Sequence, residues 1–220
     1  MTPLIALVAL LHMLVPIYWL GGDLGAFYGS NFLRDPKRSV DERMLALKIL
    51  NNVDMAPRTA LILALPTGFT LGWMKGWLPV GGDMVALLWL GGLLWLSIAW
   101  GVHLRHGPAG AGLKKIDMGI RYVVLAGLVG VGGLGVAGQI AIPLFIALKL
   151  LVLAACMTLG LIVRRQLVPL FPAIITMKQT GPTPESDAAI DRVLGQTKPT
   201  VMVLWVFVLI ACWLGLATPV

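Results

Sequence analysis

Charged residues are scarce in this chain: they make up 12% of its 220 residues, whereas 58% are hydrophobic. Because a soluble globular domain has about 25% charged residues, this composition excludes an ordinary soluble fold. The mean hydropathy of +0.89 points the same way. The only polar stretch of any length is 180–199, so we expect no separate soluble domain.

Cysteine is also rare, with Cys156 and Cys212 as its two occurrences, each inside an apolar stretch. This spacing excludes a disulfide framework and a Cys-x-x-Cys metal motif, and we expect both thiols to pack as small apolar side chains. The N-terminus lacks a basic region and a small-residue cleavage pattern. We therefore expect no cleavable signal peptide, and the first apolar stretch stays in the protein.

The chain does contain long apolar runs, near residues 3–29, 56–77, 84–103, 120–138, 140–164 and 199–218. A helix of roughly 20 apolar residues crosses the hydrocarbon core of a bilayer. The sequence thus predicts an all-α polytopic membrane bundle with six transmembrane helices, folded as a single transmembrane domain over residues 1–220.

Basic residues, which give the chain a net charge of +7, gather in alternate loops. The first, third and fifth connecting loops hold most Lys and Arg, whereas the second has only Lys75 and Asp83 and the fourth has no charge. The positive-inside rule places loops 1, 3 and 5 in the cytoplasm and both termini outside, in a bacterial-type inner membrane. Topology accounts for the basic excess, so we expect no nucleic-acid partner.

Two short helices are predicted in the cytoplasmic loops. Ser39 and Glu42 have the spacing of a capping box and open an amphipathic surface helix in the first loop. In the fifth loop, a helix is predicted to begin around Thr183 and to end at Gly195.

The motif Asp-Met-x-x-Arg occurs twice, as Asp54 to Arg58 and as Asp117 to Arg121, and it marks a weak internal repeat of residues 54–106 and 117–167. Each Asp is expected to cap a helix N-terminus, and each Arg to pair with it one turn later. These pairs have two interpretations. They anchor helices at the cytoplasmic interface, or the two Arg side chains bind carboxylates of a ligand, such as the propionates of a haem.

Four residues of the first apolar stretch share one helical face: His12, Pro16, Trp19 and Asp23. At 1.5 Å per residue, His12 lies about 13 Å from the outer end, near the middle of the bilayer, and Asp23 about 16 Å further on, in a polar network at the cytoplasmic edge. Lys149 is the only charged residue between Arg121 and Arg164, and its predicted depth matches that of His12.

An ionisable group in hydrocarbon costs about 2.5–3.5 kcal/mol on insertion scales, so such groups are usually functional or paired. His12 and Lys149 at one depth predict a shared site. A haem iron accepts imidazole from one face and a second nitrogen donor from the other. The alternative is that Lys149 pairs with a carbonyl or carboxylate and that His12 donates to a backbone carbonyl near Pro16.

His103 and His106 lie three residues apart, a spacing that binds metal on a helix. At the predicted cytoplasmic interface a solvated histidine is equally expected, so both interpretations stay open.

His12 with Trp19 and Gly22, followed by Met55, Arg58 and Pro66, resembles the first two helices of the HemJ-type protoporphyrinogen IX oxidases. The Trp-Leu-Gly-Gly after a helix histidine is also similar to the related copper-resistance D (CopD) membrane proteins. The resemblance covers about residues 10–70. It implies a b-type haem (heme b) with His12 as an axial ligand and Lys149, followed by Leu150, or His103 as the second-side group. It also implies oxidation of a porphyrin-like reductant.

The preferred hypothesis is therefore an inner-membrane haem protein that oxidises a small reductant or passes electrons to a partner protein, with Arg58 and Arg121 near the propionates. A second hypothesis is a copper or small-solute transporter with a path lined by His12, Met13, Asp23 and Lys149, since thioether and imidazole suit Cu(I). A third is a non-catalytic subunit or assembly factor, as a homo-oligomer or in a larger membrane complex.

Overall fold

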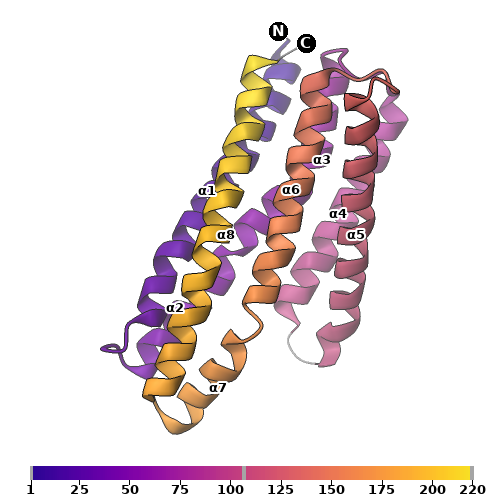
Figure 1. Cartoon of the computed structure of the whole chain (residues 1–220). Helices are drawn as coiled ribbons and strands as arrows, with labels where there is room; N and C mark the ends of the chain where they lie inside the picture. Colours follow the sequence, from indigo (N-terminus) through magenta and orange to yellow (C-terminus); the bar gives the residue numbers. More distant parts are fainter. Residues whose placement is uncertain (1, 106–107, 219–220) are drawn as a thin grey trace.

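The computed structural model describes residues 2–105 and 108–218, of which almost all are helical and none form strands. Eight α-helices make up this part of the chain (Figure 1). Their bounds are α1 Pro3–Arg34, α2 Val40–Val53, α3 Met55–Met74, α4 Gly82–Leu104, α5 Pro108–Val136, α6 Leu144–Gln166, α7 Leu170–Thr180 and α8 Pro184–Ala217. The predicted all-α class is confirmed.

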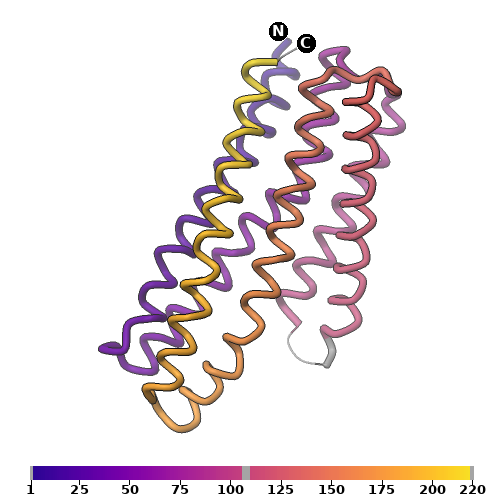
Figure 2. The backbone as a smooth tube through the Cα atoms, in the orientation of Figure 1, coloured from indigo at the N-terminus to yellow at the C-terminus, as the bar shows by residue number. Residues whose placement is uncertain are grey.

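Six long helices lie side by side along one axis, and both chain ends lie at the same end of this bundle (Figures 1 and 2). In the bundle α3 packs on α1 and α4, α5 on α4 and α6, and α8 on α6 and α1. We name the end with both termini the terminal end, which also holds the α3–α4 and α5–α6 connections. The opposite end, with the remaining connections, is the basic end.

Five helical stretches are long and apolar enough to cross a membrane: Pro3–Arg34, Gly82–Leu104, Gly110–Val136, Leu144–Thr180 and Pro184–Ala217. Large apolar side chains such as Leu87, Val123 and Trp213 point outward with more than half of their surface exposed. These are properties of a multi-pass membrane protein, because a soluble bundle would cover such a surface with polar groups.

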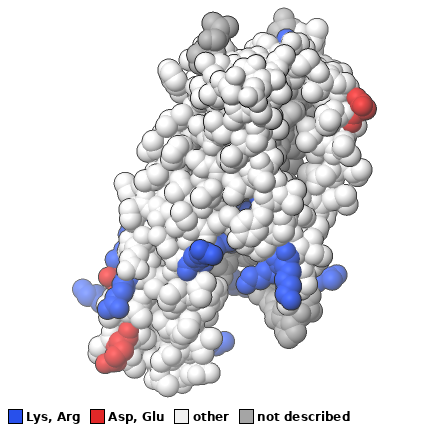
Figure 3. Space-filling model, turned by 45° about the vertical axis from the view of Figure 1, so that its right-hand side comes forward, with Lys and Arg blue, Asp and Glu red and all other residues white. Residues whose placement is uncertain are grey.

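Lys and Arg side chains are concentrated toward the basic end and are nearly absent from the rest of the visible surface (Figure 3). The helices α1 and α8, at 32 and 34 residues, are about 48 and 51 Å long, well beyond a hydrocarbon core of about 30 Å. Their excess length projects at the basic end, where it packs with α2 and α7 around a second apolar core that includes Leu33, Met177 and Ile190.

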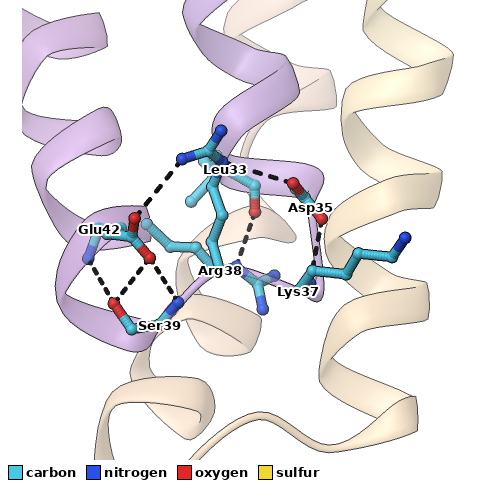
Figure 4. Close-up of polar contacts among 7 residues, drawn as sticks. Leu33, Asp35, Lys37, Arg38, Ser39 and Glu42 are labelled. Atoms are coloured by element: carbon cyan, nitrogen blue, oxygen red, sulfur yellow. Dashed lines mark hydrogen bonds and ion pairs between the residues drawn. The ribbon is translucent and has the colours of Figure 1, made fainter.

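The turn from α1 to α2 follows its predicted chemistry (Figure 4). Ser39 Oγ accepts from the Glu42 backbone N–H, and Glu42 Oε2 accepts from the Ser39 backbone N–H at 2.8 Å, so the capping box is confirmed. Arg43, which is fully buried, donates from Nε to the Leu33 carbonyl at 2.9 Å and from Nη1 to Asp187 at 2.6 Å. This ion pair joins α2 to α8.

Two boundary predictions were wrong. The loop helix does begin after its Thr183 cap, but it does not end at Gly195: α8 continues to Ala217. Ile190, Val193, Leu194 and Thr197 form one buried face, and its packing outweighs the local helix-breaking tendency of glycine.

The second error concerns α5, predicted from about residue 120 but observed from Pro108. Proline is favoured in a first helical turn, and the Lys114–Lys115 pair supports helix. Asp117 therefore lies inside α5 and does not cap its N-terminus. Asp54 does occupy the N-cap position of α3, but its side chain makes no cap hydrogen bond.

The close approach of α1 and α3 depends on Gly22. A Cβ at this position would lie 2.6 Å from Pro57 Cδ and 2.9 Å from Ala56 Cβ, whereas a Cβ at Gly21 would meet nothing within 4 Å. Gly22 thus brings the two helices together at the level of Pro57.

We predict that Gly22→Ala lowers the free energy of unfolding by about 1–3 kcal/mol, because the added methyl overlaps Pro57 Cδ and Ala56 Cβ of α3. Gly21→Ala is the matched control and changes it by less than about 1 kcal/mol. Thermal unfolding in detergent, followed by circular dichroism, measures both. Equal stability of the two variants would contradict the close contact.

Candidate functional site

A cavity of about 470 Å³ lies inside the half of the bundle nearer the terminal end, with walls from α1, α3, α6 and α8. Its lining is mostly apolar, with aromatic rings from Trp19, Phe69, Trp77 and Phe145. The volume falls within the range of about 300–1,000 Å³ typical of ligand sites.

His12 lines this cavity from α1, and its ring is oriented by Thr67 of α3. Thr67 Oγ1 lies 2.6 Å from the Leu63 carbonyl, which can only accept, so the hydroxyl proton goes there. His12 Nδ1, 2.9 Å from the same Oγ1, must then be the donor. In the neutral ring this leaves the lone pair on Nε2, which makes no hydrogen bond among the described residues.

Gly68 creates the space for this imidazole. A Cβ at Gly68 would lie 3.0 Å from His12 Cε1 and 3.6 Å from Nε2. The sequence Thr67-Gly68 thus supplies an acceptor for one side of the ring and room beside the other.

Lys149 lines the same cavity from α6. Its terminal nitrogen Nζ lies against α8, since a Cβ at Gly215 would come 2.9 Å from it. In the part of the chain that the structure describes, Lys149 forms no hydrogen bond and no ion pair, so neither the predicted carbonyl nor a carboxylate partner is found there.

The free thiols Cys156 and Cys212 also line the cavity, the first buried and the second partly exposed. Trp19 is 5% exposed and lines it as well. Asp23, one turn further along α1, does not line the cavity; it accepts from Trp205 Nε1 of α8 at 3.2 Å.

A second buried polar group, the Asp117 cluster, joins α4, α5 and α6 through Trp95, Asp117, Arg121 and Arg164. Asp117 is 1% exposed and accepts from Trp95 Nε1 at 2.9 Å and from Arg121 Nε at 3.0 Å. Arg164 Nη1 lies 3.5 Å from the same carboxylate, and the Arg121 guanidinium lies 5.5 Å from the Trp95 ring centroid. Arg121 Nη2 is buried and has no hydrogen-bond partner among the described residues.

Asp54, the N-cap residue of α3, forms an ion pair with Arg58 one turn later. We call this pair the Asp54 cluster. Both predicted i, i+4 ion pairs, Asp54–Arg58 and Asp117–Arg121, are therefore confirmed. Each Arg side chain is directed to a carboxylate of its own helix.

The structure separates these clusters from the cavity. Arg58, Arg121 and His103 are not among the cavity-lining residues. Gly68 lies against His12, and Arg58 is ten residues nearer the basic end of α3, about 15 Å away along the axis. His103 instead packs edge-to-face with Trp100, at 5.8 Å between ring centroids, and its predicted partner His106 lies outside the described residues.

Across residues 2–105 and 108–218, no three His, Cys, Asp or Glu side chains come together as a metal-binding group. The cavity therefore offers two nitrogen-bearing side chains, His12 from α1 and Lys149 from α6, and no such metal-binding group among the described residues.

Sequence reasoning missed the residues that prepare the cavity: Thr67, Gly68, Gly215 and Lys75. Thr67 is a polar residue in an apolar run, and the sequence alone marks it as a candidate. Its hydrogen bond with His12, however, depends on how α1 and α3 pack. Trp95 and Arg164 were missed for the same reason.

Comparison with protein-family models, with curated proteins and with solved structures finds no match for this chain.

We predict that Trp95→Phe lowers the free energy of unfolding by about 1–3 kcal/mol, because it removes a hydrogen bond to the buried Asp117 carboxylate and keeps an aromatic ring. Trp100→Phe is the control: its indole is exposed and donates to Thr59 at 3.3 Å, so a change below about 1 kcal/mol is expected. Chemical or thermal unfolding compares them. If Trp100→Phe costs as much as Trp95→Phe, the Asp117 cluster is not a stabilising centre.

Proposed function

We propose that this chain is an integral membrane protein that binds one b-type haem in the cavity, with His12 as an axial ligand and Lys149 as the second-side group. The observation that carries the proposal is that His12 of α1 and Lys149 of α6 line one apolar cavity. Among the described residues, neither His12 Nε2 nor Lys149 Nζ has a hydrogen-bond partner.

The donor set fits a haem better than a bare metal ion. A haem iron already has four ring nitrogens and needs only one or two axial ligands from the protein, which an imidazole can supply. When bound, the haem would supply one-electron redox chemistry at its iron.

In this proposal, the residues around His12 orient its ring and enclose the haem. Thr67 fixes the ring of His12 and its tautomer by accepting a hydrogen bond from Nδ1, as acceptors beside metal-bound histidines do. Gly68 leaves room for the ring, and the aromatic walls of the cavity exclude water. Trp19, packed below His12 on α1, forms part of that wall.

The membrane topology in this proposal has six spans, with α3 as the sixth, and both termini outside a bacterial-type inner membrane. Two observations support it. Both termini lie at the same end of the bundle, which requires an even number of crossings, and α3, at 20 residues, is about 30 Å long. The basic end, richer in Lys and Arg, is then cytoplasmic.

The proposed work is oxidation of a small, porphyrin-like reductant or electron transfer to a partner protein. The resemblance of His12, Trp19 and Gly22 to HemJ-type oxidases supports this reaction class. Arg58 and Arg121 take no part in it: they act as helix anchors at the cytoplasmic edge, paired with Asp54 and Asp117.

A copper or small-solute transporter is a second candidate, favoured by the thioether of Met13 and the thiols of Cys156 and Cys212 in the same cavity. Soft sulfur ligands select Cu(I). The lack of a three-residue His, Cys, Asp or Glu group within the described residues weighs against a single-ion site.

The deciding experiment is a reduced-minus-oxidised spectrum of the protein purified from its membrane. We predict Soret and α bands in the wild type, their loss in His12→Ala, and their retention in His103→Ala, a control that removes the same side chain away from the cavity. In Thr67→Val, haem affinity falls about 10–100-fold, because the acceptor that orients the His12 ring is lost.

A wild type without bands, or a His12→Ala variant with unchanged bands, would overturn the haem proposal. Stoichiometric copper in a colourless protein would favour the transporter instead.

A further inference from the structure

The cavity opens sideways, to the surface that faces lipid. Met13 and Ile17 of α1 and Leu216 of α8 line it, and yet they are 61%, 58% and 87% exposed. The opening therefore lies between α1 and α8, in the half nearer the terminal end.

The other half of the α1–α8 seam is closed by specific contacts. Asp23 accepts from Trp205, Phe27 stacks on Trp205 at 5.3 Å, and Lys198 donates to Asn31 at 3.1 Å. Among the described residues, no hydrogen bond, ion pair or ring contact between α1 and α8 lies beyond Asp23 toward the terminal end. Within the described residues, polar and aromatic contacts therefore join the two helices only on the side of the cavity toward the basic end.

Lys75 is the second charged residue that lines the cavity. It follows the last turn of α3 at the terminal end, and its Nζ lies 4.4 Å from the Trp77 ring centroid. It has no ion pair among the described residues. The aromatic face stabilises the ammonium group but leaves its hydrogen-bond donors free for an anion.

The position of Lys75 relative to His12 suits a ligand with an acidic edge. Lys75 is seven residues along α3 from Gly68, which contacts His12, a rise of about 10 Å. Arg58 is about 15 Å away in the other direction and is already paired with Asp54. Of these two cations, Lys75 alone is unpaired and borders the cavity.

We infer that Lys75 binds the carboxylates of a lipid-soluble ligand that reaches the cavity from the bilayer through the α1–α8 opening. This rests on the proposed function for the identity of the ligand as haem, whose two carboxylates would face the terminal end, opposite to the Arg58 side. The chemistry recognised is an apolar, bilayer-soluble body with an acidic edge.

The first test measures the affinity of apoprotein in neutral-lipid nanodiscs for haemin and for haemin dimethyl ester, which lacks the free carboxylates. The wild type should bind the acid about 10- to 150-fold more tightly, the ratio expected from one charge-assisted hydrogen bond. Lys75→Gln should bind both forms equally, with the ester's affinity unchanged. Lys178→Gln, an exposed lysine of α7, should keep the preference.

The second test addresses the opening. Ile17→Trp narrows it, and transfer of haemin from vesicles into the protein should slow several-fold. Leu24→Trp, which adds the same bulk at an exposed α1 position outside the cavity lining, should leave the transfer rate unchanged.

The outcomes separate the two proposals. Equal affinity for acid and ester in the wild type, a preference retained in Lys75→Gln, or an unslowed Ile17→Trp overturns this inference while leaving haem binding intact. Unchanged haem bands in His12→Ala, together with an acid preference that requires Lys75, overturn the assigned axial ligand and support this inference. Failure of both haemin and its ester to bind overturns both.

Discussion

The hydrogen bond between His12 and Thr67 determines what the cavity can do. A histidine within an apolar bundle must satisfy its polar atoms, and Thr67 satisfies one of them, because its own proton is committed to the Leu63 carbonyl. The remaining nitrogen of the neutral ring is left with its lone pair at the cavity. One threonine therefore fixes the ring orientation of a costly buried group that lines the cavity.

The Asp117 cluster differs from the cavity in how its buried polar groups are paired. Asp117 is surrounded by donors from Trp95, Arg121 and Arg164, so its charge is compensated inside the bundle. Lys149 has no hydrogen-bond or ion-pair partner among the described residues and lines the cavity. Compensated charges join helices, whereas uncompensated ones remain available for binding.

The sequence was sufficient to predict features that depend on residues close together in the chain. The Ser39–Glu42 box, the i, i+4 pairs and the apolar helices follow from spacing alone. The boundary at Gly195 did not, because packing of a continuous helical face overrode the glycine signal there. The helix start expected at Asp117 was wrong because Pro108 and the Lys114–Lys115 pair favour helix before it. Thr67, Gly68 and Gly215 depend on which helices touch, and a single sequence does not encode that in its periodicity. Likewise, Arg58 was assigned to a ligand from its charge, whereas its direction toward Asp54 follows from the tilt of helical side chains.

The most direct measurement of the central claim is the ¹⁵N NMR spectrum of the His12 ring in protein reconstituted in lipid without haem. The account predicts a neutral ring protonated on Nδ1, with an unprotonated Nε2 whose signal changes when haemin is added, and a mixture of tautomers in Thr67→Val. A ring protonated on Nε2, or one indifferent to haemin, would contradict it.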